Sequence, residues 1–169
     1  MNKRNTPSTE LDYLAELVGE FIEYWGFKRV HGRVWAHLYL SGRPMDAAEL
    51  MDRLEVSKAL MSMTLSTLLE FNVIQPAEGK GRHGARLYQA NPNPTEAIVN
   101  VLRSREKRLL AKISSAHRLA KELPASKANG KEIDSKRLAS FGSLLAQGEG
   151  LLDQIIAFGG TGLFDTETP

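Results

Sequence analysis

The 169-residue chain contains no cysteine, which excludes a disulfide framework, thiolate-bound zinc, iron–sulfur clusters and a cysteine nucleophile. It also lacks an uninterrupted apolar run of about 18 residues, the length that a membrane span needs. Its first residues carry no apolar segment of the kind found in secretion signals. We therefore expect a cytoplasmic protein. The net charge is only +2, so a polyanion would have to be bound by local clusters of charge.

Catalytic and cofactor-binding motifs are also missing. The strings G-x-S-x-G, H-E-x-x-H and G-x-x-x-x-G-K-[ST] do not occur, and the histidines at 31, 37, 83 and 117 include no close pair at metal-ligand spacing. A G-x-G-x-x-G match at 79–84 is followed by strand-like residues, whereas a dinucleotide-binding loop needs a helix there. We therefore expect no enzyme, no cofactor and no metal ion.

The hydrophobic periodicity predicts short helices followed by a hairpin. Apolar residues recur at intervals of three and four over 8–26, 31–41, 47–54 and 57–71, the period of helices with one buried face. Pro44 favours an extended segment at 43–46, and Asp46 with Glu49 fits a capping box. Asn72 suits a left-handed residue after a helix. Strand-like residues at 73–76 and 85–90 flank a polar tip at 78–84, which predicts a β-hairpin.

Two longer helices are predicted in the second half of the chain. The first begins with Asn93 as cap and Pro94 in the first turn, and its apolar stripe continues to Pro124. Residues 125–130 are interpreted as a linker, and a last helix is expected from about Ile133 to the glycines at 159–160. Residues 161–169 are interpreted as a loose tail.

The helix at 57–71 is the first candidate functional element. Met61, Leu65, Leu68 and Thr64 can face a core, which leaves a short outer face with little charge and small side chains. That face comprises Ser57, Lys58, Ala59, Leu60, Ser62, Met63, Ser66 and Thr67. A helix that is only solvated more usually carries Glu and Lys pairs. A slim face of hydroxyl and apolar groups suits entry into the major groove of DNA.

The hairpin tip is the second candidate element. Lys80, Arg82 and Arg86 place three cations along it beside His83, and Glu78 is the only anion nearby in the sequence. Phosphate oxygens would satisfy such a cationic tip, and arginine side chains suit a narrow minor groove. The alternative interpretation is a polar loop that is simply solvated.

The run from about 32 to 89 resembles the winged helix-turn-helix of MarR-type transcriptional regulators. It is most similar to the GbsR branch, in which L-Y-L-S, V-S-K and S-M-x-L recur in this order, as they do here at 38–41, 56–58 and 62–65. The similarity extends over about residues 10–120. Asn72 departs from the pattern, because a glycine is usual at that position.

This resemblance implies a mainly α fold with a small β-hairpin wing and long dimerisation helices. Together with the predicted helices, it divides the chain into a DNA-binding domain at 28–92, a helical dimerisation region at 8–27 and 93–160, and the tail at 161–169. It further implies a homodimer on palindromic double-stranded DNA, with the recognition helix in the major groove. The resemblance places Ser57, Lys58, Ser62 and Met63 on the recognition helix, and Lys80, Arg82 and Arg86 on the wing. With Leu60, Ser66 and Thr67 of the outer face described above, these are the candidate DNA-binding residues.

The charges and apolar stripes of the long helices leave two questions open. Residues 103–121 hold seven cations and the single anion Glu106, while the first helix holds five carboxylates and no cation. The basic run is either a solvated face, an extension of the DNA contact or a partner of the acidic helix. The apolar stripes that begin at Ile98 and Leu138, together with the first helix, are expected to form a dimer surface. The alternative is that these three helices pack together within a monomer.

Aromatic residues concentrate in the first two helices. Tyr24, Trp25 and Trp35 are candidates for binding a quaternary ammonium effector such as choline or glycine betaine, the metabolites linked to some GbsR-type proteins. Packing in the core is the alternative interpretation. The sequence therefore predicts a dimeric DNA-binding regulator, most simply a repressor that responds to a small molecule. The alternative function is a winged-helix adaptor that binds proteins instead of DNA.

Overall fold

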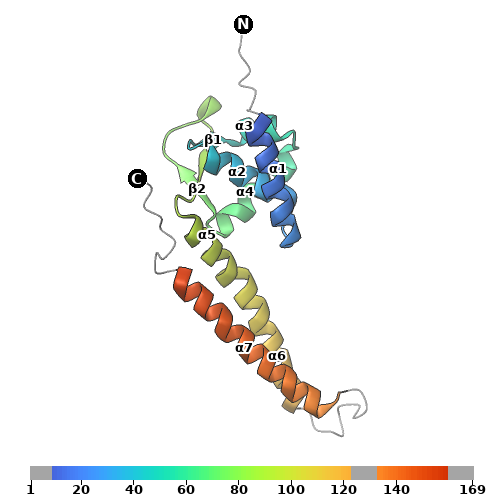
Figure 1. Ribbon diagram of the computed structural model, residues 1–169. Helices are drawn as coiled ribbons and strands as arrows, with labels where there is room; N and C mark the ends of the chain where they lie inside the picture. The colour runs from blue at the N-terminus through green and yellow to red at the C-terminus, as the bar shows by residue number, and fades with distance from the viewer. Residues whose placement is uncertain (1–8, 123–132, 160–169) are drawn as a thin grey trace. The chain divides into compact units, whose positions relative to one another are not determined.

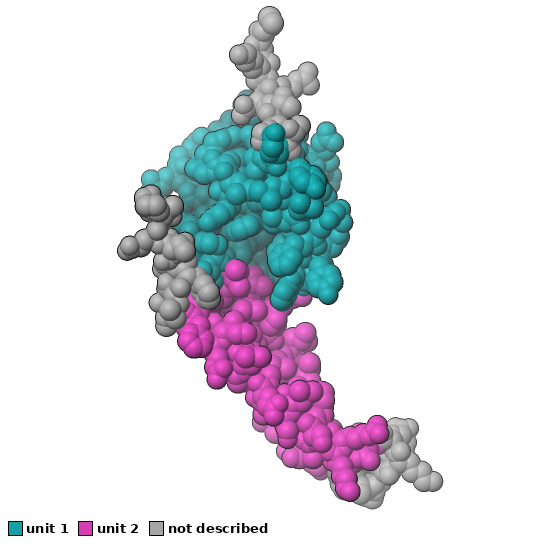
Figure 2. Space-filling model, viewed as in Figure 1, with its two compact units in different colours: residues 1–97 teal, residues 98–169 magenta. Residues whose placement is uncertain are grey.

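The computed structural model describes residues 9–122 and 133–159, so the predicted linker at 125–130 and tail at 161–169 lie outside the described residues. The chain forms two compact units, residues 1–97 and 98–169 (Figure 2).

The described residues of the first unit up to Asn93 form four helices, three short strands and one 3₁₀ turn (Figure 1). They are α1 (Thr9–Tyr24), α2 (Arg29–Leu40), β1 (Met45–Asp46), α3 (Ala47–Leu54), α4 (Lys58–Glu70), β2 (Ile74–Ala77), the 3₁₀ turn η1 (Arg82–Gly84) and β3 (Leu87–Ala90).

The core of the first unit lies between α2, α3, α4 and a small sheet. Its side chains are at most 7% exposed, because the apolar faces of the helices meet here. They are Val30, Val34, Leu38, Met45, Leu50, Leu54, Met61, Leu65, Leu68 and Ile74. The three antiparallel strands have the order β1-β3-β2. The hairpin and the extended segment at 43–46 confirm the prediction, while the pairing of that segment with β3 as a third strand was not predicted.

Helices α1 and α2 approach each other closely at two glycines. A Cβ atom on Gly32 would lie 2.8 Å from the Val18 carbonyl oxygen and 2.9 Å from the Cα atom of Gly19. A Cβ atom on Gly19 would lie 2.9 Å from the Arg29 carbonyl oxygen. Any larger residue at Gly32 would therefore press against backbone, which cannot move aside as a flexible side chain can.

The acidic face of α1 is paired with cations of α2. Arg29 forms ion pairs with Glu16, Glu20 and Glu23 at 2.9–3.5 Å, and Arg33 binds Glu16 at 3.0 Å. The hydrogen bonds that the Arg29 guanidinium donates to the carboxylates of Glu23 and Glu16 raise the pKa of Arg29. One interpretation of the sequence paired the acidic first helix with the basic run at 103–121. Three of its carboxylates, those of Glu16, Glu20 and Glu23, instead form ion pairs with arginines of α2.

Most helix starts and stops follow the predicted signals. Asp46, Ser57 and Asn93 cap α3, α4 and α5 (Pro94–Val101) through their side-chain oxygens, and Asn72 adopts a left-handed φ of 54° after α4. The predicted capping box at α3 is only half correct. The side chain of Glu49 binds Arg43 and Arg53, because two cations compete with the single amide that the box would offer.

The second unit contains two antiparallel helices (Figure 1). The chain enters it within α5 and continues through a π-helical turn, η2 (Leu102–Glu106), into α6 (Lys107–Glu122), so the predicted long helix is interrupted once. Helix α7 (Ser135–Gly159) packs along α6 through three polar contacts. Lys107 binds Asp153 at 2.5 Å, Ser114 binds Glu149 at 2.6 Å, and the His117 ring lies 2.8 Å from the Leu138 carbonyl oxygen.

Candidate nucleic-acid interface

Helix α4 presents the buried face that the sequence predicts. Met61, Thr64, Leu65 and Leu68 are 1–5% exposed and lie in or against the core. Four buried residues at intervals of three and four fix the rotation of the helix about its axis. The intervening positions must therefore face away from the core, and this determines which side chains are available to a partner.

The outer face of α4 is exposed, slim and poor in charge. Ala59, Ser62, Met63 and Ser66 are exposed at helical spacing, with Lys58 near the start of the helix and Glu70 at its end. Met63 is the large apolar side chain of this face and is 59% exposed. The Thr67 hydroxyl donates to the Met63 carbonyl oxygen at 3.1 Å.

Leu60 departs from the prediction. The sequence placed it on the outer face of α4, but its side chain is half-buried and packs against the core cluster. The reason is its position one residue before Met61, at the edge of the buried stripe. Of the two large apolar residues expected outside, Leu60 and Met63, Met63 alone presents most of its surface to solvent.

The hairpin tip is anchored to the start of α3 by Asp46. One carboxylate oxygen of Asp46 accepts from the Glu49 amide and the other from the Arg82 amide, both at 2.8 Å. Burial of this side chain raises its pKa, but the hydrogen bonds from Glu49 and Arg82 outweigh that effect and lower the pKa below its usual value. Gly81 makes room for the contact, because a Cβ atom there would lie 2.5 Å from the carboxylate.

The cations of the tip differ in their surroundings. Lys80 and Arg86 are exposed and make no ion pair with another described residue. The Arg82 guanidinium binds the Asp52 carboxylate of α3 at 3.0 Å, and both side chains are more than half exposed. Glu78 is therefore not the only acid near the tip, because the fold brings Asp52 to it from 30 positions away.

Three residues of this region escaped sequence reasoning. Asp46 was predicted only as a helix cap, Gly81 only as part of the polar tip at 78–84, and Asp52 was not singled out. Their roles depend on contacts between residues 30–36 positions apart. A capping aspartate has a second oxygen free to accept, and this was the one local signal of a further partner for Asp46.

The basic run of the second unit is largely exposed. Lys107 is paired with Asp153, and Arg105 lies 3.4 Å from Glu106. Five further cations are exposed on the helical segment: Arg103, Arg108, Lys112, Arg118 and Lys121. Much of the predicted positive field is therefore accessible to solvent.

The aromatic effector candidates occupy different surroundings. Tyr24 is 89% exposed and Trp25 is 53% exposed, with the Trp25 ring 6.1 Å from that of Phe21. Trp35 packs partly against the core and stacks on Tyr39, with ring centroids 4.9 Å apart and planes inclined by 12°. The position of Trp35 therefore favours a role in packing. The proposed binding of an effector by these three residues stays a prediction.

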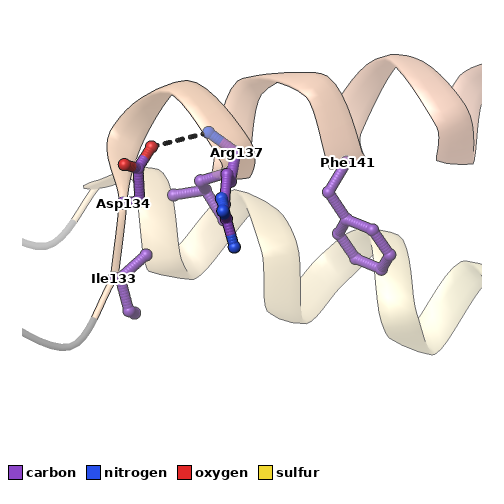
Figure 3. Close-up of a pocket in the computed structure, with 5 residues that line it drawn as sticks. Ile133, Asp134, Arg137 and Phe141 are labelled. Carbon is purple, nitrogen blue, oxygen red and sulfur yellow. Dashed lines mark hydrogen bonds between the residues drawn. The ribbon is translucent and has the colours of Figure 1, made fainter.

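Two clefts open on the surface. One of about 210 Å³ in the first unit is lined by residues of α2, β3 and the segments after them: Leu38, Tyr39, Gly42, Arg43, Pro44, Gln89, Ala90, Asn91 and Pro92. Another, of about 420 Å³, lies at the start of α7 beside Ile133, Arg137, Leu138 and Phe141 (Figure 3). Its one acid, Asp134, caps α7 by accepting from the Arg137 amide at 2.9 Å (Figure 3), so this carboxylate serves the helix start.

Two of the four histidines are buried in the first unit. His31 accepts from the Lys28 amide at 3.0 Å, and burial lowers its pKa. His37 is 1% exposed, with its Nε2 atom 3.6 Å from the Asp12 carboxylate, and burial lowers its pKa as well. His83 is exposed at the tip. Among the described residues, no group of three or more histidine or acidic side chains could hold a metal ion.

The comparisons with known proteins concern the fold. No protein-family model and no curated protein matches the sequence. A solved structure described as a transcriptional regulator is similar over 88% of this chain and 96% of its own, with a TM-score of 0.61 and 18% identity. A MarR family regulator from Neisseria meningitidis, NMB1585, aligns over 91% of this chain and 99% of its own, with a TM-score of 0.38 and 16% identity.

The first of these likenesses, together with the helices and three-stranded sheet described above, shows a mainly α fold with a winged helix. None of the helices in the described part of the chain combines the length and the apolar character that crossing a membrane requires.

Proposed function

We propose that this chain is a sequence-specific regulator of transcription that binds double-stranded DNA as a homodimer in the cytoplasm. We propose that it is a MarR-like regulator, and that it belongs to the GbsR-like branch that its sequence resembles. The observation that carries the proposal is the outer face of α4, which is exposed, slim and nearly uncharged, in the same unit as a cationic tip anchored through Asp46. An enzyme would need an assembled set of reacting groups, and we propose a binding role instead.

The two elements would make different contacts with the duplex. Helix α4 would enter the major groove, where Ser57, Lys58, Ser62, Met63 and Ser66 reach base edges and phosphates. Lys80, Arg82 and Arg86 would bind the backbone or the minor groove beside it. The tip lies against α3 and α3 packs against α4, so both elements belong to the same compact unit. Leu60 and Thr67 contribute less, because one packs inward and the hydroxyl of the other is bonded to the backbone.

Exposed apolar surface in both units supports a homodimer. On α1, Tyr13, Leu14, Leu17, Phe21 and Tyr24 are 42–89% exposed, although the opposite face of the helix is already packed on α2. On α6 and α7, residues Leu109, Leu119, Leu144 and Leu151 are 58–64% exposed. Surface of this kind marks an interaction site, and a two-fold dimer would also double the few bases that one short helix can read.

These exposed surfaces support the domain division that we propose from the sequence. Residues 28–92 would bind DNA, and residues 8–27 and 93–160 would form the dimer. The protein would act as a repressor whose binding is tuned by a small molecule near Tyr24, Trp25 and Trp35. The exposure of Tyr24 and Trp25 supports that role.

The alternative, an adaptor that binds proteins through α4, has less support. It would need an apolar patch at Leu60 and Met63, and the inward packing of Leu60 reduces that patch to one side chain.

The test is binding of the full chain to duplex DNA from its own upstream region at several salt concentrations. The logarithm of the affinity should fall linearly with the logarithm of the salt concentration, because bound cations release counterions. The Lys80→Ala/Arg82→Ala variant should bind all sequences less tightly and flatten the slope by about one to two. Glu78→Ala at the same tip is the matched control and should not flatten it. An unchanged slope and affinity in the double variant would refute the role of the tip.

The dimer has its own test. Sedimentation of the full chain should give twice the monomer mass of 18.7 kDa. The Leu144→Glu/Leu151→Glu variant should sediment as a monomer, because burying a charge in an apolar interface without a partner is costly. A wild-type chain that sediments as a monomer at all concentrations would refute the homodimer.

A further inference from the structure

The outer face of α4 lacks the side chains that most often read guanine, adenine and cytosine. Arginine pairs with guanine, asparagine and glutamine with adenine, and acidic side chains with cytosine. The sequence of α4, KALMSMTLSTLLE, contains no arginine, asparagine, glutamine or aspartate, and its one glutamate is the last residue. Lys58 can reach a guanine or a phosphate only from the first turn. The middle of the helix must therefore read bases by other means.

The groups in the middle of that face are two hydroxyls and one thioether chain. Ser62 and Ser66 are exposed, and a serine hydroxyl both donates and accepts, so it discriminates little among bases. The Thr67 hydroxyl is bonded to the Met63 carbonyl oxygen. Met63 is therefore the side chain in the middle of this face that is left to discriminate among bases. It lies between the two serines in the sequence and is 59% exposed. It is apolar, flexible and long enough to adapt its shape to a groove.

The 5-methyl group of thymine is the apolar feature of the major groove. A contact between it and Met63 would remove both apolar surfaces from water, which is favourable by about 0.8 kcal/mol per buried CH₂ group, or about fourfold in affinity. No other base presents such a group in unmodified DNA. Met63 thus has one chemically matched contact in the groove, and the serines beside it do not compete for that contact.

We infer that Met63 is a specificity-determining residue that selects a thymine in each half-site through the 5-methyl group. This inference rests on the proposed function, because it requires α4 to lie in the major groove. It assigns the sequence preference of the helix centre to a methyl contact instead of a hydrogen bond. The preferred duplex therefore carries a thymine at a fixed position, and removal of one methyl group weakens binding.

The experiment uses the full chain and duplexes selected by it from a random pool. Each thymine of the selected site is replaced in turn by uracil, which pairs identically but lacks the methyl group, at the symmetric positions of both half-sites. One position should lose about fourfold in affinity per half-site, or about fifteenfold for both. Cytosine at that position should bind weakly, and 5-methylcytosine should restore part of the affinity.

Variants connect the methyl group to the residue. Met63→Ala should bind the thymine and uracil duplexes equally, while Met63→Leu, which keeps an apolar side chain, should retain the difference. Leu40→Ala, at a 46% exposed leucine at the end of α2, is the matched control and should also retain it.

The possible failures are distinguishable. If selection enriches no sequence and the salt dependence is absent, the proposed function itself fails. If a site is enriched but no uracil substitution weakens binding, the inference about Met63 fails while the proposed function stands. A thymine preference that persists in Met63→Ala assigns the methyl contact to another residue and likewise overturns the inference. The uracil substitutions test the wild-type chain, so the result does not depend on the folding of any variant.

Discussion

The Asp46 carboxylate accepts a hydrogen bond from the backbone amide of Arg82 at 2.8 Å, across 36 positions of sequence. The same carboxylate caps α3 through the Glu49 amide. One side chain that is 2% exposed therefore fixes both the start of a helix and the tip of the hairpin.

Replacement of Asp46 by alanine should destabilise the protein by about 1–3 kcal/mol. The variant loses the helix cap, which contributes about 1 kcal/mol, and leaves the part-buried Arg82 amide without its acceptor. Chemical denaturation monitored by circular dichroism measures the loss. Asp52→Ala, at an exposed aspartate of the same helix, is the control and should stay within about 1 kcal/mol of the wild type. Equal effects of the two substitutions would contradict the anchoring role of Asp46.

Gly81→Ala tests the same contact from the other side. The new Cβ atom would lie 2.5 Å from the Asp46 carboxylate and 2.8 Å from its Cβ atom, so the tip must shift, at a cost of about 1–3 kcal/mol. In the Asp46→Ala background the carboxylate is absent and the cost of Gly81→Ala should be smaller. A double-mutant cycle measures this coupling. Strictly additive effects would show that the two residues do not constrain each other.

The sequence predicted the local features of this region but not its long-range contacts. The cap at Asp46, the left-handed Asn72 and the buried stripe of α4 follow from spacing and residue type, which act within a few positions. The position of Leu60 was missed, because a residue at the edge of a helical stripe is assigned by packing and not by period. The pairing of Arg82 with Asp52 was missed because only the tertiary fold brings them together.

The same limit explains the long helices. The interval pattern predicted a continuous helix from Pro94, and the described chain is helical from Pro94 to Glu122, but a π turn lies at Leu102–Glu106. One extra residue in a turn changes the register of the apolar stripe without changing the residue types. The pattern of apolar intervals therefore cannot locate it.

Asp52 is expected to restrain the DNA affinity of the tip. Its carboxylate binds the Arg82 guanidinium at 3.0 Å, so a phosphate must compete with it for that cation. Asp52→Ala should tighten duplex binding by up to about fivefold, the equivalent of an exposed ion pair of up to about 1 kcal/mol. Fluorescence anisotropy with a labelled duplex at constant salt measures the change.

Arg82 provides the control for that prediction. In the Arg82→Ala background, Asp52→Ala can release no guanidinium, so the gain should fall to the part that comes from lost repulsion between Asp52 and phosphate. Weaker binding by the Asp52→Ala single variant would show instead that the ion pair positions Arg82 for DNA.

His37 should make the first unit less stable in mild acid. Burial lowers its pKa, and the nearby Arg33 and Arg53 add to this while Asp12 opposes it. The unfolded chain therefore takes up the proton near the ordinary pKa of about 6.5, before the folded chain does. The free energy of unfolding then falls as the pH decreases below about 6.5, by at most about 1.4 kcal/mol per pH unit from this histidine.

The effect is measured by denaturing the wild type and His37→Gln at several pH values between about 7.5 and about 5. This range brackets the ordinary histidine pKa of about 6.5. The variant should show a smaller slope. His31, whose pKa burial also lowers, contributes slope in the same window, so His31→Gln should also reduce it and the double variant should reduce it most. An identical slope in His37→Gln and the wild type would refute the contribution of His37.

Gly32→Ala should separate α1 from α2. The added Cβ atom would meet the Val18 carbonyl oxygen at 2.8 Å and the Gly19 Cα atom at 2.9 Å, and both are backbone atoms, so the helices must move apart. Overpacking of this kind costs about 1–3 kcal/mol, although alanine favours a helix over glycine by about 1 kcal/mol. Thermal unfolding measures this loss of stability.

Gly150→Ala in α7 is the matched control. Nothing lies within 4 Å of its new Cβ atom, so only the helix preference of alanine remains and the variant should be as stable as the wild type or more stable. The ion pairs of Arg29 with Glu16, Glu20 and Glu23 join α1 to α2, so moving these helices apart in Gly32→Ala should also make the free energy of unfolding less sensitive to salt. A Gly32→Ala protein as stable as Gly150→Ala would show that the two helices do not need the close approach at Gly32.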